Sequence, residues 1–264
     1  MKNLIKITLL LYFLPLLTLA NAKVSTASGI LNQNKTILTV AITNKGYFPY
    51  NYTENGIRKG FTIDVVNYFE ANSNYDFEFI ILPWPRALYL VAQGKVDLVL
   101  TLFKSKEREQ TYHFIEPSYA NEANQLFSLS DHNINFTGKL SQLTPYAIGT
   151  IREYSYGESF DQANYLTKLP ALTEEVLLKL LVSKRIDVAI SNPLTFNNLI
   201  IEQNLENKVV AIKPYVEITP VYLALTRVRE DSAKIAKDLG VLTQKLKASN
   251  YYQALLNKYQ LNFN

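Results

Sequence analysis

The sequence predicts a two-lobed α/β protein, in which each lobe contains a mostly parallel sheet flanked by helices. Apolar, β-branched runs alternate with amphipathic helical segments over residues 36–102, and the same alternation recurs over residues 146–190. Strand–helix–strand units of this kind form parallel sheets with helices on their faces. No stretch rich in Pro, Gly or Ser separates the two units, so ordinary extended strands are expected to join them as a hinge.

The first unit is predicted to contain three buried strands and two helices. The strands are expected at residues 36–42, 76–82 and 96–102. Their near-continuous apolar character is typical of strands covered on both faces. A helix over 64–71 follows the first strand, and a second helix begins near Pro85 and ends before Gly94.

The second unit repeats this order, and the C-terminal region adds helices. A strand, a helix and a strand are expected at residues 146–149, 172–182 and 186–190. The segment 231–259 is predicted to be mostly helical, because its leucines and isoleucine fall near helical spacing. GKVDLVL at 94–100 and SKRIDVAI at 183–190 look like the same element in both units, which predicts structural roles for Asp97 and Asp187.

Composition excludes several classes of function. The chain has 264 residues, enough for one large domain or two modest ones at roughly 150 residues per domain. It has no Cys, which excludes disulfides, thiolate metal sites and a catalytic Cys, and its two His make a His-based metal site unexpected. A formal charge of +4 gives no reason to expect nucleic-acid binding. No phosphate-binding, metalloprotease or serine-hydrolase motif is present, so we expect no cofactor, no metal and no catalytic residue.

The N-terminal segment has the pattern of a secretory signal peptide, predicted over residues 1–22. It has a basic start, an apolar stretch over 7–19 and a small-residue cleavage site at 20–22. The alternative, a membrane anchor, needs about 20 apolar residues to span a bilayer. Residues 23–35 are expected to form a flexible leader, and a cysteine-free exported chain fits the bacterial periplasm.

Several short motifs occur in a fixed order along the chain. The segment KSKER at 104–108 is followed by YHFIEPSY at 112–119. The others are FPY at 48–50, GFTID at 60–64, GKVD at 94–97, IGT at 148–150, KRID at 184–187 and a closing helix at 245–259. Together these motifs resemble the bacterial extracellular solute-binding proteins of family 3, periplasmic receptors for amino acids and similar small solutes. The resemblance spans about residues 36–260, and PWPRA at 83–87 marks a less-studied subgroup whose ligands are often unknown.

The resemblance implies the type II periplasmic-binding-protein fold. Lobe 1 would hold residues 36–121 and 220–264, and lobe 2 would hold residues 122–219. Two crossing strands would form the hinge, and a small-molecule ligand would bind in the cleft between the lobes and close them. The implied partner is an inner-membrane ABC-type permease or a sensor, and the protein is expected to be a monomer.

Seven candidate ligand-binding residues lie in the predicted lobe 1, and four of them follow its second and third strands. By position, Arg108 matches the family's Arg that grips a ligand carboxylate; the alternative is a solvated Arg in a charged run. Trp84 and Arg86 begin the helix at the place where α/β sheets present their ligand crevice. Trp84 would stack on a ring or cation and Arg86 would pair with an anion. The alternative is that Trp84 caps the core and Arg86 is a surface residue. Phe103 stands where the family's amino-acid receptors carry Ser or Thr, which suggests an apolar wall.

Aromatic residues in two loops are further candidates. Tyr47, Phe48 and Tyr50 follow the first strand, where they either line the cleft or pack over the sheet edge. Tyr154 and Tyr156 precede a predicted helix whose free N–H groups would suit an anion, and the two rings either face the cleft or lie exposed.

Asn192 falls where the family's amino-acid receptors carry the Asp that holds the ligand's ammonium. A neutral amide does not pair with an ammonium as a carboxylate does. A carboxylic acid, a peptide-like solute or an aromatic metabolite therefore stays open beside an α-amino acid.

The function expected from the sequence is capture of a small polar ligand, amino-acid-like or an organic acid, for an ABC-type importer, without catalysis. One alternative is a ligand-sensing module for a signalling partner. Another is a periplasmic enzyme on the same fold, similar to cyclohexadienyl dehydratases, which act on prephenate or arogenate.

Overall fold

The computed structural model describes residues 35–43 and 46–263, which belong to one compact unit, Asn34–Asn264. The predicted signal peptide and nearly all of the predicted leader lie outside the described residues. No helix in the described part of the chain is long and apolar enough to cross a membrane.

The first strands and helices follow the predicted order. They are β1 (Thr36–Ile42), the hairpin β2 (Tyr52–Glu54) and β3 (Ile57–Lys59), α1 (Phe61–Ala71), β4 (Tyr75–Ile81), α2 (Trp84–Ala92) and β5 (Leu98–Phe103). The short hairpin was not predicted. Helix α1 begins three residues before the predicted start, directly after Gly60, whose φ of 129° favours glycine at this position.

The remaining elements complete a second α/β region and return to the first. They are α3 (Lys106–Thr111), β6 (Tyr112–Phe114), β7 (Ala120–Leu129), β8 (Ala147–Ile151), α4 (Glu158–Asp161), β9 (Thr167–Ala171), α5 (Glu174–Val182), β10 (Val188–Ser191), α6 (Pro193–Glu202), β11 (Val209–Thr226), α7 (Ser232–Lys247) and α8 (Asn250–Tyr259). A 3-10 turn (Leu140–Leu143) precedes β8. The predicted C-terminal helical region is confirmed as α7 and α8.

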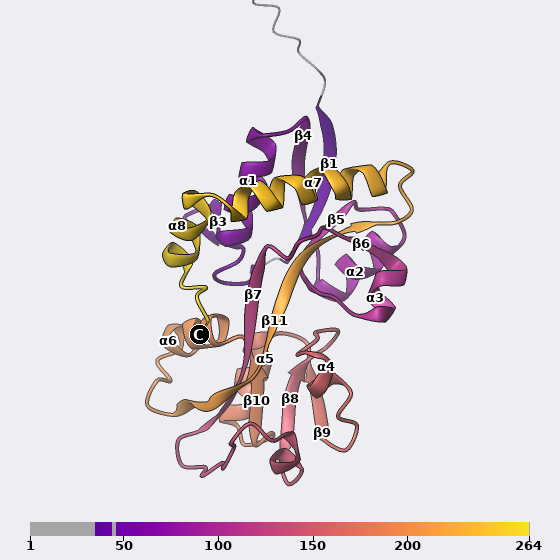
Figure 1. The fold of residues 1–264 in the computed structure, drawn as a ribbon. Coiled ribbons are helices and arrows are strands. Elements are labelled where there is room, and N and C mark those ends of the chain that lie inside the picture. The colour runs from indigo at the N-terminus through magenta and orange to yellow at the C-terminus, as the bar shows by residue number, and fades with distance from the viewer. Residues whose placement is uncertain (1–34, 44–45, 264) are drawn as a thin grey trace, which may run out of the picture. The chain divides into compact units, whose positions relative to one another are not determined.

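The strands form a mixed sheet that β7 and β11 hold together. Its order over the described residues is β4-β1-β5-β11-β7-β10-β8-β9, with β6 paired to β11. The βαβ pairs β1–β4, β1–β5, β8–β9 and β8–β10 are parallel, as predicted. The prediction of a separate sheet in each lobe was incomplete, because the long strands β7 and β11 run side by side and antiparallel and belong to both halves (Figure 1).

The buried apolar residues divide into two groups of clusters. One group draws on residues before position 121 and after position 220, with α1, α7 and α8 on one sheet face and α2 on the other. The second group draws on residues 126–209, with α5 and α6 on one face and Tyr156 and Phe160 on the other. We call these regions lobe 1 and lobe 2; the predicted boundary residues between them stay a prediction.

Asp97 and Asp187 hold equivalent places in the two lobes. The Asp97 carboxylate accepts hydrogen bonds from the backbone N–H and the hydroxyl of Thr39, both at 2.8 Å, and from Arg229 at 3.1 Å. The Asp187 carboxylate accepts from the backbone N–H of Ala147 at 2.8 Å. Asp97 thus ties the start of β5 to β1, and Asp187 ties the start of β10 to β8, so the predicted structural roles are confirmed.

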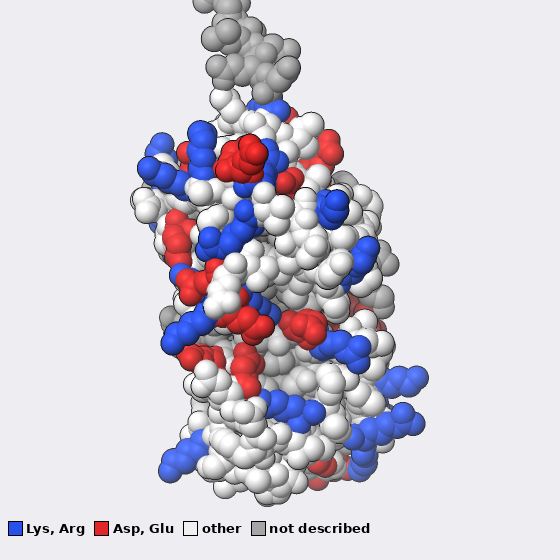
Figure 2. Space-filling view, turned by 90° about the vertical axis from the view of Figure 1, so that its right-hand side faces the viewer, with Lys and Arg blue, Asp and Glu red and all other residues white. Residues whose placement is uncertain are grey.

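Charges of both signs are interspersed over the face of the molecule shown in Figure 2. That face shows no large field of a single sign. Long-range attraction of a polyanion or polycation depends on such a field.

The two aspartates predict a graded loss of stability. Replacing Asp97→Ala leaves the part-buried N–H and the hydroxyl of Thr39 without their acceptor and removes one of the two carboxylates that bind Arg229, and should lower the free energy of unfolding by about 3 kcal/mol. Asp187→Ala removes one such bond and should lower it by about 1–2 kcal/mol. Urea denaturation measures the free energy of unfolding of both variants.

The control is Asp131→Ala, which removes an exposed ion pair with Lys184 and should change the free energy of unfolding by less than about 1 kcal/mol. An equal loss in all three variants would contradict the structural roles of Asp97 and Asp187.

Candidate functional site

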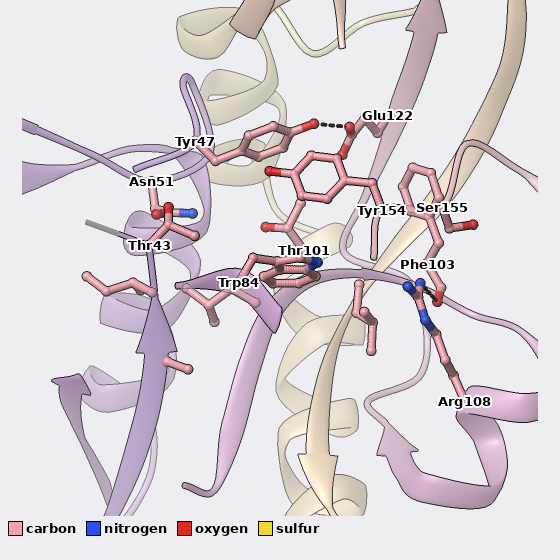
Figure 3. Close-up of a pocket in the computed structure, with 14 residues that line it drawn as sticks. Thr43, Tyr47, Asn51, Trp84, Thr101, Phe103, Arg108, Glu122, Tyr154 and Ser155 are labelled. Carbon is pink, nitrogen blue, oxygen red and sulfur yellow. Dashed lines mark hydrogen bonds between the residues drawn. The ribbon is translucent and has the colours of Figure 1, made fainter. Parts of the chain in front are cut away.

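A pocket opens where the carboxyl ends of β1 and β5 meet the start of β7 and the loop after β8 (Figure 3). It is lined by Ala41, Ile42, Thr43, Tyr47, Asn51, Trp84, Leu100, Thr101, Leu102, Phe103, Arg108, Glu122, Tyr154 and Ser155. Eleven of these precede position 121, and Glu122, Tyr154 and Ser155 follow it. Ligand crevices of open α/β sheets lie at this carboxyl edge. Of the ten residues predicted from the sequence, five line the pocket: Tyr47, Trp84, Phe103, Arg108 and Tyr154.

Arg108 brings a positive charge to the pocket. Helix α3, capped by the Ser105 hydroxyl, carries the side chain back toward the end of β5. Its guanidinium donates to the carbonyl of Phe103 at 3.0 Å and to the carbonyl of Glu153, in lobe 2, at 3.1 Å. Burial lowers the pKa of Arg108 from its usual value, and no carboxylate of the described residues forms an ion pair with it. Three of its five N–H groups thus have no acceptor within residues 35–43 and 46–263.

Three aromatic rings surround the middle of the pocket. The ring centres of Trp84 and Tyr154 are 5.9 Å apart, and those of Tyr47 and Tyr154 are 6.1 Å apart. Both pairs pack edge to face. The Trp84 indole N–H donates to the Glu153 carbonyl at 3.3 Å, the same oxygen that Arg108 uses. Glu153 has a φ of 65°, a left-handed conformation uncommon outside glycine. The turn at Glu153 therefore presents one lobe 2 oxygen to two lobe 1 donors.

A β-bulge in β5 shapes the pocket floor. Leu98 and Leu100 belong to the core under α1 and α7, whereas Leu102 belongs to the core under α2. Alternation would place all three on one face. Thr101, with a φ of 59°, is the extra residue, and the register with β11 shifts beside it. Bulges of this kind re-aim the chain next to binding sites.

Glu122 is a buried acid that faces the pocket from β7. Its side chain is 4% exposed, and its carboxylate accepts a hydrogen bond from the Tyr47 hydroxyl (Figure 3). Burial raises the pKa of Glu122 to about 7, and the Tyr47 bond opposes this rise. No Lys or Arg of the described chain forms an ion pair with it. Burial also raises the pKa of Tyr47 well above its usual value.

A second acid, Glu174, lies behind the aromatic rings at the start of α5. Both of its carboxylate oxygens accept from the Ser191 hydroxyl at 3.0 Å. Burial raises its pKa to about 8, and the nearby Glu122 charge adds to the rise. In the described residues, no group of three or more Asp, Glu or His is arranged to hold a metal ion.

Three of the predicted residues in lobe 1 lie outside the pocket lining. Arg86 is exposed, with its guanidinium 5.4 Å from the ring centre of Tyr89, so the surface alternative holds. Tyr50 is fully buried and donates to the Asn121 carbonyl at 3.1 Å. Phe48 packs on Tyr52 with ring centres 5.0 Å apart. For Tyr50 and Phe48 the packing alternative holds.

Two predicted residues of lobe 2 also lie outside the lining. Tyr156 is 3% exposed, and its hydroxyl accepts the Ile151 N–H at 2.6 Å, so it belongs to the lobe 2 core. Asn192 is 1% exposed and caps α6, where its Oδ1 accepts from Leu194 N–H at 2.9 Å and Thr195 N–H at 3.2 Å. Its Oδ1 is therefore committed to helix capping, whereas its Nδ2 is buried and has no hydrogen-bond partner among the described residues.

Sequence reasoning missed the polar residues of the pocket. Glu122 lies in the strand segment ANEANQ, whose polar letters indicate solvent exposure, although Glu122, Asn124 and Gln125 are all buried. Thr43 and Asn51 flank the aromatic loop, and only the aromatic residues of this loop were predicted as candidates. Thr101 sits in an apolar strand run, and nothing in that run signals a bulge.

The raised pKa values predict how stability depends on pH. A carboxyl with a folded pKa of about 7 and an unfolded pKa near 4.5 stabilises the fold below about pH 4.5, and this contribution is lost as the pH rises through 7. Glu174 extends the loss to about pH 8. Glu122→Gln should therefore show a smaller fall in Tm between about pH 5 and pH 8 than the unchanged protein.

The control for this measurement is Glu107→Gln, an exposed residue of α3. It should keep the full fall in Tm over the same pH range. An unchanged pH dependence in Glu122→Gln would show that Glu122 ionises normally in the folded protein.

Comparisons with known proteins identify the fold and the family of this chain. A search of curated proteins found no match. Among solved structures, a histidine kinase sensor domain with similarity to periplasmic binding proteins has a TM-score of 0.75 at 18% identity, covering 86% of this chain and 96% of its own. The substrate-binding protein of an amino acid ABC transporter has a TM-score of 0.70 at 15% identity, covering 84% and 98%. A putative L-cystine ABC transporter protein from Listeria monocytogenes has a TM-score of 0.68 at 22% identity, covering 85% and 95%.

These structures share the type II periplasmic-binding-protein fold with this chain, which confirms the predicted fold. The model of the bacterial extracellular solute-binding proteins, family 3, matches residues 38–262. The match covers nearly all of the described chain and includes every residue that lines the pocket. The chain therefore belongs to the bacterial extracellular solute-binding proteins of family 3.

Proposed function

We propose that this protein captures a small solute with an anionic group in the pocket between lobe 1 and lobe 2. The observation that carries the proposal is the state of Arg108. Its guanidinium is partly buried at the pocket, its protein partners are two carbonyl oxygens, and three N–H groups are left for a ligand. A planar guanidinium binds a carboxylate with two charge-assisted hydrogen bonds.

Contacts between the lobes support binding by closure. Arg108 and Trp84 both donate to the Glu153 carbonyl, and the Thr195 hydroxyl donates to the Phe48 carbonyl. A ligand held between these contacts would touch both lobes. Its binding would favour the closed arrangement only by its greater affinity for that arrangement.

The proposed setting is the periplasm, with the closed protein presented to an inner-membrane ABC-type permease. Family membership and the amino acid ABC transporter neighbours support this role. The similarity to a histidine kinase sensor domain favours a second candidate, a sensing module for a signalling partner. Both roles use the same binding event and differ in the partner that recognises the closed form.

The ligand class can be found with the chain's only tryptophan. Trp84 lines the pocket, so its fluorescence reports on ligand entry without interference from other indoles. Amino acids, dipeptides, organic acids and polyamines form the panel, with Tm as a second readout. A ligand at 100 times its dissociation constant should stabilise the protein by about 2.7 kcal/mol. Conversion of prephenate to phenylpyruvate would favour the dehydratase alternative, and no response to any anionic solute would contradict the proposal.

Two arginines of lobe 1 provide a matched pair of variants. Arg108→Ala should weaken binding of an anionic ligand about 30-fold or more, because it removes charge-assisted hydrogen bonds in a partly buried site. Arg86→Ala removes an exposed guanidinium over Tyr89 and should leave affinity within about twofold. Titration of Trp84 fluorescence measures both. Equal effects of the two substitutions would reject Arg108 as the anion-binding group.

A further inference from the structure

Two polar atoms in the pocket have no hydrogen-bond partner among the described residues. The Asn51 Oδ1 and the Thr43 Oγ1 are both buried, both residues line the pocket, and neither atom has a hydrogen-bond partner. Asn51 is 6% exposed. A buried polar atom without a partner destabilises a protein by about 1–3 kcal/mol, so such atoms call for an explanation.

The loop that carries Asn51 is held rigidly by close backbone contacts. Tyr47 and Asn51 form a backbone bridge, in which the Asn51 N–H donates to the Tyr47 carbonyl at 3.0 Å. A Cβ on Gly46 would lie 2.4 Å from the Asn51 carbonyl oxygen, and one on Gly60 would lie 2.3 Å from the Tyr50 carbonyl oxygen. The amide of Asn51 is thus presented by a backbone with little freedom to move. Preorganised groups of this kind lower the entropic cost of binding.

The two unpartnered atoms lie away from the guanidinium. In Figure 3, Asn51 and Thr43 are on one side of the Trp84 indole and Arg108 is on the other. The pocket therefore has an anion-binding end and, across the aromatic rings, an end with two free oxygens. Asn51 Oδ1 accepts hydrogen bonds, and a Thr hydroxyl both accepts and donates. A ligand N–H or O–H group would satisfy both.

We propose that Asn51 and Thr43 form a second subsite that selects ligands carrying a hydrogen-bond donor, an amide, hydroxyl or amine, at the end opposite their carboxylate. This inference rests on the proposed function, because it assumes that Arg108 holds the carboxylate. It names the class of ligand more closely: a bifunctional solute, anionic at one end and donating hydrogen bonds at the other.

A matched series of short carboxylates tests the subsite. Succinamate, 4-hydroxybutanoate and 4-aminobutanoate each carry a donor, whereas butanoate and pentanoate carry none. The donor compounds should bind about tenfold or more tightly than the plain acids, by Trp84 fluorescence titration. Comparison within the three donors shows whether the subsite takes a neutral or a charged group.

Variants separate the subsite from the anion site. Asn51→Leu and Thr43→Val should each reduce the preference for the donor compounds about tenfold and leave the affinity for plain acids unchanged. Asn51→Leu should also keep or raise the Tm of the ligand-free protein, because it removes an unpaired buried oxygen; a structural amide would lower it. Asn67→Leu, at an exposed position of α1, is the control and should leave the preference intact.

The outcomes distinguish the two proposals. Equal binding of donor and plain acids, lost in Arg108→Ala, would overturn the donor subsite and keep the proposed function. A large loss of Tm in Asn51→Leu would also overturn it. Failure of every carboxylate to bind the unchanged protein would contradict both proposals.

Discussion

The antiparallel pairing of β7 with β11 is the constraint on which the rest of the structure depends. Its ladder begins at Ala120 opposite Val221 and ends at Leu129 opposite Val209, so it supplies strands to the cores of both lobes. Between Asn124 and Leu126 the register shifts, and β11 places four residues, 213–216, opposite one residue of β7. Such an irregularity bends and twists a strand pair locally. The bend therefore falls between the two cores, close to Glu122 along β7.

The same pairing explains how a carboxylate comes to be buried without a cation. Glu122 lies opposite Thr219, within the regular part of the ladder, and its strand cannot slip without turning every neighbouring side chain to the other face. The fold thus holds Glu122 against the Tyr47 hydroxyl, although burial favours its neutral form. Arg108, by contrast, is a charged group whose guanidinium donates to two carbonyl oxygens. Neither group neutralises the other, which leaves the pocket polar at both ends.

The periodicity of apolar residues was sufficient to predict the scaffold, because buried strands and helices follow regular patterns of apolar residues. The strands at 36–42, 76–82 and 186–190 match the observed ones within two residues, and the Asp97 and Asp187 contacts follow from a repeated local pattern. The pocket departs from those rules. The bulge at Thr101 breaks the alternation in β5. The direction of each aromatic side chain in the loop depends on the backbone conformation, which the residue types alone do not predict. Tyr47 and Tyr50 are three residues apart, yet one lines the pocket and the other is core.

In the proposed hinge closure, the contacts between the lobes limit how strongly the protein favours the closed arrangement without a ligand. Hydrogen bonds to the Glu153 and Phe48 carbonyls replace bonds that the same groups make with water when the lobes separate, so each contributes only about 1 kcal/mol. Trp84 and Tyr154 add an edge-to-face contact of similar size. Open and closed arrangements that differ by a few kcal/mol respond to a ligand with modest differential affinity. In the proposed binding mode, the differential affinity comes from the pocket residues of lobe 2, Tyr154 and Ser155, because Arg108, Asn51 and Thr43 all belong to lobe 1 and gain a ligand partner in either arrangement.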